Sequence, residues 1–115
     1  MKLVYVAGKF RGPNAWAIEQ NIRAAEVVGM EVAQLGAAPV IPHANTRFFH
    51  GTITDEFWLA ATMALLERCD AVMLVPGWPT STGALAEVAR AKQLGLPVFC
   101  VGEFDMLATW LKEAT

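Results

Sequence analysis

An acidic residue on an otherwise apolar helical face is the feature of this sequence that points most directly to chemistry. The periodicity of residues 83–94 predicts a helix, and one of its faces carries four apolar side chains: Ala84, Val88, Ala91 and Leu94. Glu87 falls on the same side, in the second turn, where the helix dipole favours an ionised carboxylate. A carboxylate in such a place can act as a nucleophile or a general base. The alternative is a surface ion pair between Glu87 and Arg90, which would contribute little to stability.

The turn that precedes this helix, residues 76–83 (PGWPTSTG), has two features that suit an anion. Ser81 offers a hydroxyl group, and Gly83 allows a ligand to approach the backbone at the N-terminus of a helix. The hydroxyl-bearing residues of the turn could instead simply cap the helix. Trp78, in the same turn, could stack on a nucleobase or cover the edge of the core. Both alternatives stay open at the level of sequence.

Three further side chains could take part in a polar site. Arg11 lies in a glycine-bearing loop, 8–12 (GKFRG), which matches no dinucleotide or NTP motif but could bind an anion through its guanidinium. His43 directly follows the second predicted strand. Tyr5 lies inside the first predicted strand, and a carboxylate such as Glu87 would satisfy its hydroxyl if it is buried. The two histidines and two cysteines lack metal-ligand spacing, so we expect no metal site.

Short apolar runs alternate with helical periodicity along the chain. Strands are predicted at 3–7, 38–41, 71–75 and 97–101. Helices are predicted at 15–35 (with Asn14 as its cap), from 54 or 55 to 66, at 83–94 and at 104–112. We therefore expect an α/β fold, a flavodoxin- or Rossmann-like three-layer sandwich with a parallel sheet of about four to five strands. Ligands of such folds bind beyond the carboxyl ends of the strands, where four loops are expected: 8–14, 42–53, 76–82 and 102–103.

Length and composition limit the kind of protein this can be. At 115 residues, the chain is expected to form one domain, residues 1–115. A hydrophobic fraction of 55% with only 17% charged residues leads us to expect a homodimer or higher homo-oligomer, in which another copy covers apolar surface. The net charge of −2, without basic clusters, argues against nucleic acid, and no apolar run is long enough to span a membrane. Two isolated cysteines and no signal-peptide pattern favour a cytoplasmic location.

Three short motifs together resemble a known superfamily. They are Y-V-A-G at 5–8, C-D-A-V at 69–72 and G-W-x-x-S-x-G-A-x-x-E at 77–87. In this order they resemble the nucleoside 2-deoxyribosyltransferase-like proteins, particularly a short phage and bacterial branch. The chain is also similar to the 2′-deoxynucleoside 5′-monophosphate N-glycosidases. The resemblance covers nearly the whole chain, and the S-x-G-x-x-x-E element is its most specific part.

The resemblance implies a role for each matching residue. Glu87 would attack the anomeric carbon of a nucleoside or nucleotide, and Tyr5 would hydrogen-bond this carboxylate. Ser81 matches a serine that contacts the 5′-phosphate in the monophosphate hydrolases, and His43 matches a histidine of their sugar–phosphate pocket. The glycine and arginine positions of their first loop are matched by Gly8, Arg11 and Gly12. The implied reaction is cleavage of an N-glycosidic bond, by hydrolysis or by transfer of a base, and it requires no metal or other cofactor.

One position departs from the family pattern. The monophosphate hydrolases carry an aspartate eight residues before the position of Asp70, where it helps to position substrate or assist the leaving base, and this chain has Thr62 there. Asp55, two helical turns earlier on the same face, could substitute for it. If catalysis is reduced, the chain would be a nucleotide-binding or sensing module. A cytokinin-activating type of phosphoribohydrolase, whose PGGxGTxxE motif fits this turn less well, and a structural phage protein are further alternatives.

Overall fold

The computed structural model describes residues 1–114 and contains one four-stranded sheet. Its strands are β1 (Leu3–Ala7), β2 (Ala38–Val40), β3 (Ala71–Leu74) and β4 (Val98–Phe99). All pairings are parallel, and the strand order is β2-β1-β3-β4. The helical elements are α1 (Ala15–Gln34), α2 (Pro42–Asn45), α3 (Asp55–Leu66), the 3₁₀ turn η1 (Trp78–Thr80), α4 (Thr82–Gln93) and α5 (Phe104–Glu113).

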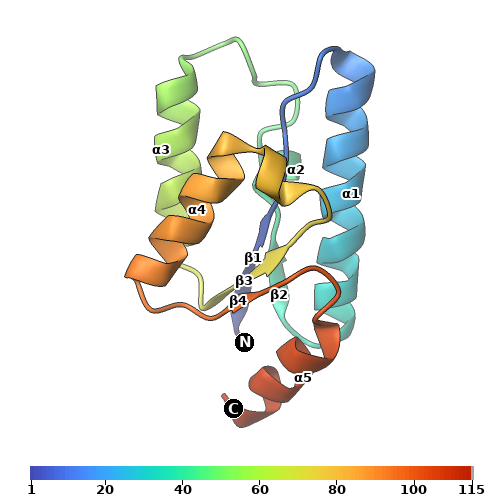
Figure 1. Cartoon of the computed structure of the whole chain (residues 1–115), viewed down its shortest axis with the longest axis vertical. Coiled ribbons are helices and arrows are strands. Elements are labelled where there is room, and N and C mark those ends of the chain that lie inside the picture. The colour runs from blue at the N-terminus through green and yellow to red at the C-terminus, as the bar shows by residue number, and fades with distance from the viewer. Residues whose placement is uncertain (115) are drawn as a thin grey trace.

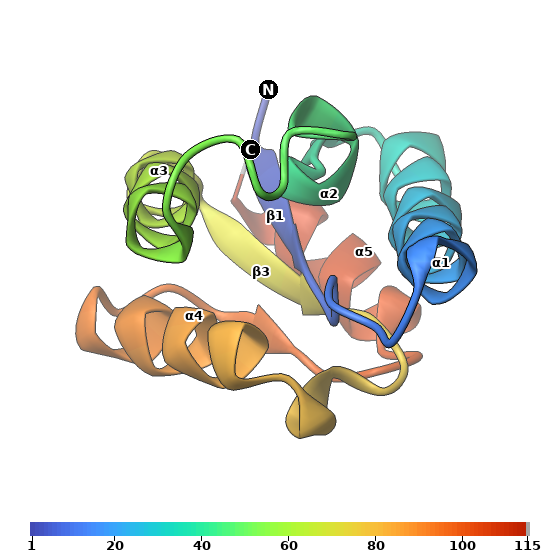
Figure 2. The ribbon, with the colours of Figure 1, turned by 90° about the horizontal axis from the view of Figure 1, so that it is seen from above.

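The sheet separates two layers of core, each covered by helices. Successive side chains of β1 point to opposite faces because a strand has a period of two. Val4 and Val6 pack with side chains of α1 and α5, whereas Tyr5 and Ala7 pack with side chains of α3 and α4. Figure 2 shows α1 on one side of β1 and β3, and α3 and α4 on the other. The predicted three-layer α/β sandwich is therefore confirmed.

Side-chain caps define where the helices begin. Asn14, Thr54 and Ser81 each accept a hydrogen bond from the backbone N–H three residues later, at 2.8, 3.2 and 3.1 Å. Each bond satisfies one of the N–H groups that have no partner within the helix. Gly36, with φ of 97°, follows the end of α1 in a conformation that other residues rarely adopt. The predicted starts of α1 and α3 are confirmed.

Two segments differ from the prediction. Residues 42–53 are not all loop, because Pro42 begins the one-turn helix α2, which is too short to produce a periodic pattern. Strand β4 has only two residues instead of five, and it pairs only with β3 because it lies at the sheet edge. Beyond it, the backbone N–H of Cys100 donates to the carboxylate of Glu103, at 2.7 Å, and the chain turns into α5.

The longest helix, α1, has 20 residues and is amphipathic. It buries one apolar side against the sheet and carries Glu19, Arg23 and Glu26 on the other. Within residues 1–114, no helix combines the length and the apolar character needed to cross a membrane.

Helix α5 is attached to the core by Leu107, which is fully buried, whereas its neighbour Met106 is 56% exposed. We expect Leu107→Ala to lower the free energy of unfolding by about 2–5 kcal/mol, because it leaves a cavity beside the sheet. The matched control Met106→Ala should change it by less than about 0.5 kcal/mol. Urea unfolding of the two variants tests this, and equal stabilities would contradict the packing of α5.

Candidate active site

A cavity of about 770 Å³ lies at the carboxyl ends of the strands. This volume falls within the range of roughly 300–1,000 Å³ that is usual for small-molecule sites. Its walls come mainly from residues within 8–12, 42–51, 55–62 and 80–87, so three of the four loops expected at this edge contribute. The loop at 102–103 does not, since it follows the edge strand β4. Figure 1 shows the loops that lead into α1 and α3 at the same end of the molecule.

The sheet order explains why the cavity forms here. From β1 the chain crosses to β2 at one edge, whereas β3 leads to β4 at the other edge. The loops after β1 and β3 therefore diverge, and a crevice opens between them. Gly8 lies at the end of β1, and a Cβ atom there would lie 2.7 Å from Cβ of Val75. The close approach of the two strand ends requires glycine at this position, and Gly8 also lines the cavity.

Glu87 and Tyr5 meet at the inner end of this cavity. The Glu87 side chain projects from α4, lines the cavity and is 6% exposed. Tyr5, in the middle of β1, is fully buried, and its hydroxyl donates a hydrogen bond to Oε2 of Glu87. Because this contact joins residues 82 positions apart, it depends on the pairing of β1 with β3 and on the packing of α4.

Burial controls the protonation of the pair. It raises the pKa of Glu87 from 4.5 to about 7, although the hydrogen bond from Tyr5 lowers it in part. The pKa of Tyr5 is raised by burial and by the nearby Glu87 charge, so its phenol keeps its proton and acts as a donor. At neutral pH Glu87 is therefore present in both its protonated and its ionised form, as an acid–base group requires.

His43 has a defined tautomer. Its Nε2 atom lies 3.1 Å from the carbonyl oxygens of both Gly8 and Lys9, which only accept, so Nε2 carries the hydrogen. Burial lowers the pKa of the ring, which favours the neutral form. His43 lines the cavity, and its contacts with Gly8 and Lys9 hold the first loop.

The N-terminus of α4 is open toward the cavity. The Ser81 hydroxyl accepts from the N–H of Ala84, which leaves its own hydrogen available to a ligand. A Cβ atom at Gly83 would meet only the Ser81 oxygen, at 3.8 Å, so no other described atom fills the space there. Ser81 and Gly83 both line the cavity, at the N-terminus of α4.

Arg11 and Asp55 form an exposed ion pair at the rim. Their side chains are 75% and 67% exposed, and the N–O distance is 2.9 Å. Both residues line the cavity, Arg11 from the first loop and Asp55 from the first turn of α3. The structure thus places Asp55 as the partner of a cation, whereas Thr62, two turns later, lines the cavity with Glu87.

Trp78 lies outside the cavity, where it packs against the core beneath α4. This position favours the second of its two interpretations, covering the core edge. The aromatic wall is made instead by side chains that the sequence did not single out, Phe10, His50 and Trp58. The Phe10 ring lies 5.9 Å from that of His43 and 6.0 Å from that of His50. One indication of this wall was present in the sequence: Phe10 and His50 lie in loops that were expected at the ligand-binding edge of the sheet.

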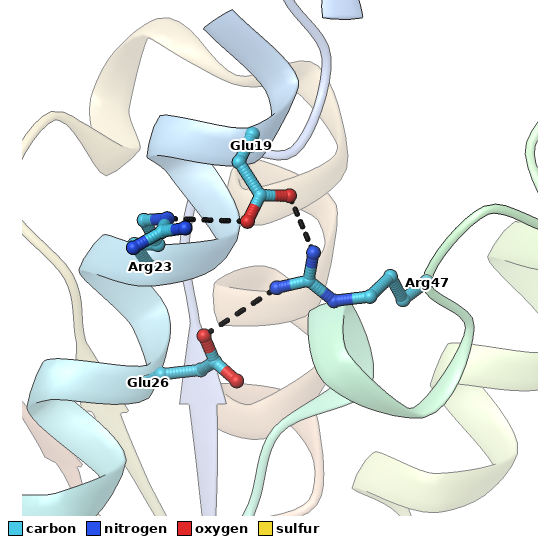
Figure 3. Close-up of polar contacts among 4 residues, drawn as sticks. All are labelled: Glu19, Arg23, Glu26 and Arg47. Carbon is cyan, nitrogen blue, oxygen red and sulfur yellow. Dashed lines mark hydrogen bonds and ion pairs between the residues drawn. The ribbon is translucent and has the colours of Figure 1, made fainter. Parts of the chain in front are cut away.

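An ion-pair network holds one wall of the cavity against α1 (Figure 3). Arg47, in the segment after α2, pairs with Glu19 and, at 3.6 Å, with Glu26. Arg23 pairs with the second oxygen of Glu19 at 3.1 Å. The hydrogen bond from Arg47 is the main reason why the pKa of Glu19 is lowered. These contacts hold the segment that brings Thr46 and the following loop to the cavity.

Within residues 1–114, no three histidine, cysteine or acidic side chains are grouped as metal ligands. Among solved structures, the chain is similar to a 2-deoxyribosyltransferase from Bacillus psychrosaccharolyticus, with a TM-score of 0.65 and 17% identity. The similarity covers 85% of this chain and 70% of that one, and at this identity it shows a shared fold. No curated protein matches the chain. The family model described as "Domain of unknown function (DUF7768)" matches residues 2–101, and the chain therefore belongs to this family.

Proposed function

We propose that this protein cleaves the N-glycosidic bond of a nucleoside or nucleoside 5′-monophosphate, with Glu87 as the nucleophile. The observation that carries the proposal is a buried carboxyl, held by Tyr5, at the wall of a cavity of nucleotide size. The fold is similar to that of a 2-deoxyribosyltransferase, which supports the same class of reaction here. With a pKa of about 7, a substantial fraction of Glu87 is ionised at neutral pH, and the ionised form is the one that nucleophilic attack requires.

The stability cost of Glu87 is a reason to assign it a function. A carboxyl whose pKa rises from 4.5 on folding to about 7 costs roughly 3 kcal/mol of stability once it is ionised. An apolar residue would pack beside Val88 and Ala91 without this cost. A small domain that keeps such a group at a cavity wall does so for chemistry more readily than for packing.

The reaction follows from the two oxygens of Glu87. Tyr5 donates to Oε2, so Oε1 is the oxygen available to attack C1 of the sugar. As the C1–O bond forms, the C1–N bond breaks, and the base leaves with the electron pair and takes a proton from solvent. Water then attacks C1 of the glycosyl ester, releasing the sugar and restoring the carboxylate; a second base would instead give transfer. A carboxylate beside C1 also stabilises the oxocarbenium-like transition state.

The other walls suit the rest of such a substrate. We assign a 5′-phosphate to the N-terminus of α4, with Ser81 and Gly83 as its seat and Arg11 at the rim. His43 would face the sugar. The aromatic side chains of Phe10 and Trp58 offer surfaces on which a base can stack.

A nucleotide-binding module with reduced catalysis is the second candidate. Thr62 favours it, because a threonine hydroxyl cannot supply the proton that a carboxylic acid could give to a leaving base. Asp55 is already paired with Arg11. Calorimetric binding of a nucleoside monophosphate without release of free base would support this candidate over the enzyme.

We also propose that the protein forms homo-oligomers in the cytoplasm. Phe48, Phe49 and Phe57 are 76%, 48% and 47% exposed, and a second copy of the chain could cover such rings. Both cysteines are free thiols, as in a reducing compartment. Light scattering at micromolar concentration should report a dimer or larger species, and a strict monomer would contradict the proposal.

Replacement of the nucleophile should abolish turnover and leave the fold intact. Glu87→Gln removes the negative charge but can still accept from Tyr5, so we expect base release to fall at least about a thousandfold. The assay is chromatography of free base from a panel of nucleosides and 5′-monophosphates. Glu67→Gln, an exposed acid paired with Arg90, is the control and should retain full activity. A Glu87→Gln variant with more than about a tenth of the wild-type rate would rule out nucleophilic attack by this residue.

The same variant should change how stability depends on pH. Between about pH 4.5 and 7 the folded protein holds a proton on Glu87 that the unfolded chain has lost, so wild-type stability falls as the pH rises through this window. We expect Glu87→Gln to remove this loss and to be up to about 3 kcal/mol more stable than wild type at pH 8. Urea unfolding at pH 5 and pH 8 measures the difference. Parallel pH profiles would show that Glu87 is not held as described.

A further inference from the structure

Thr62, the position that departs from the pattern of the monophosphate hydrolases, lies close to the Tyr5–Glu87 pair. It sits on α3 one turn before Leu66, on the same helical face. Leu66 is fully buried and packs in the same layer of the core as Tyr5. Thr62 also lines the cavity together with Glu87. Three neighbouring elements, α3, β1 and α4, thus bring Thr62, Tyr5 and Glu87 to one place.

The Thr62 hydroxyl has two hydrogen-bond partners in reach. One is the backbone carbonyl of Leu59, which accepts the Thr62 hydrogen at 2.9 Å in the structure, and the other is the phenol of Tyr5, whose pKa the Thr62 hydroxyl lowers. Its single hydrogen can serve only one of them at a time. The Leu59 carbonyl lies inside α3, where the helix already gives it an N–H partner. Turning the Thr62 hydrogen toward Tyr5 therefore leaves no carbonyl without a partner.

We propose that Thr62 is a positioning residue whose hydroxyl donates to the Tyr5 oxygen and so directs the Tyr5 hydrogen onto the ionised carboxylate of Glu87. Tyr5 has one hydrogen and gives it to Glu87, which leaves its oxygen free to accept. A hydroxyl that accepts a hydrogen bond becomes a stronger donor, because bonds in a chain polarise one another. The chain Thr62–Tyr5–Glu87 stabilises negative charge on Glu87 through Tyr5, at the wall of the cavity.

The direction of this effect agrees with the electrostatics of Tyr5. Burial and the Glu87 charge raise the pKa of Tyr5, whereas the hydrogen bond with Thr62 lowers it, as donation to the phenol oxygen does. Burial raises the pKa of Glu87, and the hydrogen bond from Tyr5 lowers it. Thr62 can therefore influence the Glu87 carboxylate through Tyr5. It acts as a positioning residue and not through direct contact.

The other titratable groups around the pair should not mask the effect of Thr62 on the Glu87 pKa, because they are neutral, paired or act on another group. Cys69, which follows α3, acts on Tyr5, but burial raises the pKa of its thiol to about 11, so it stays neutral near pH 7. Asp70, before β3, acts on Cys69. On α4, the Arg90 guanidinium is bound to Glu67. At the rim, Arg11 and Asp55 pair with each other.

The test is a titration of the Glu87 carboxyl by carbon-13 NMR of glutamate-labelled protein, with the resonance assigned by its loss in Glu87→Gln. Thr62→Val keeps the shape of threonine and removes the hydroxyl, and we expect it to raise the Glu87 pKa by about half a unit. Thr62→Ala should shift it in the same direction. Thr62→Ser, the matched control, keeps the hydroxyl and should leave the pKa at the wild-type value.

A second arm asks whether Thr62 acts through Tyr5. In a Tyr5→Phe background, Thr62→Val should cause no further shift, because the chain is already broken. The proposal is overturned if the Glu87 pKa stays constant or falls in both hydroxyl-free variants, or if the shift persists without the Tyr5 hydroxyl. The reactive role of the ionised carboxylate rests on the proposed function, but the titration does not. A protein that releases no base would refute the function and leave this result unaffected.

Discussion

The hydrogen bond from Tyr5 to Glu87 joins the first strand of the sheet to the helix that follows the third. A carboxyl that is 6% exposed would be costly without such a partner, so its presence requires Tyr5 to lie directly beneath α4. That placement in turn requires β1 to pair with β3 and the side chain of Tyr5 to point to the α3–α4 face. The position of the candidate nucleophile is therefore set by buried contacts at the centre of the fold.

The rest of the cavity is built differently, from loops held by local contacts. His43 bonds the backbone of the first loop, Gly8 lets two strand ends approach, and Arg47 binds the segment after α2 to α1. Loops positioned by a rigid scaffold are the usual carriers of ligand specificity. Under the proposed function, side chains of the sheet and α4 carry out the reaction, and the loops select the base and the sugar phosphate.

Much of the fold could be predicted because it follows from periodicity and local caps. Apolar runs gave the strands, and Asn14 and Thr54 marked helix starts. The Tyr5–Glu87 contact was expected from residue chemistry and from the family resemblance. Contacts that depend on tertiary position were missed: the one-turn helix α2, the aromatic wall with Trp58, and the network of Arg47. No sequence pattern distinguishes these side chains from ordinary loop and helix residues. The sequence left two roles open for Trp78, packing at the edge of the core and stacking on a ligand. Only its position in the fold distinguishes them.

A covalent bond between a sugar and Glu87 is the central claim, and mass spectrometry can detect it directly. The protein would be incubated with a 2′-deoxy-2′-fluoro nucleoside and its 5′-monophosphate, whose fluorine slows hydrolysis of a glycosyl ester, and then digested. We expect a mass increase equal to the fluorinated sugar or sugar phosphate, confined to the peptide that contains Glu87. Release of base with an unmodified Glu87 peptide, or modification of another residue, would contradict it.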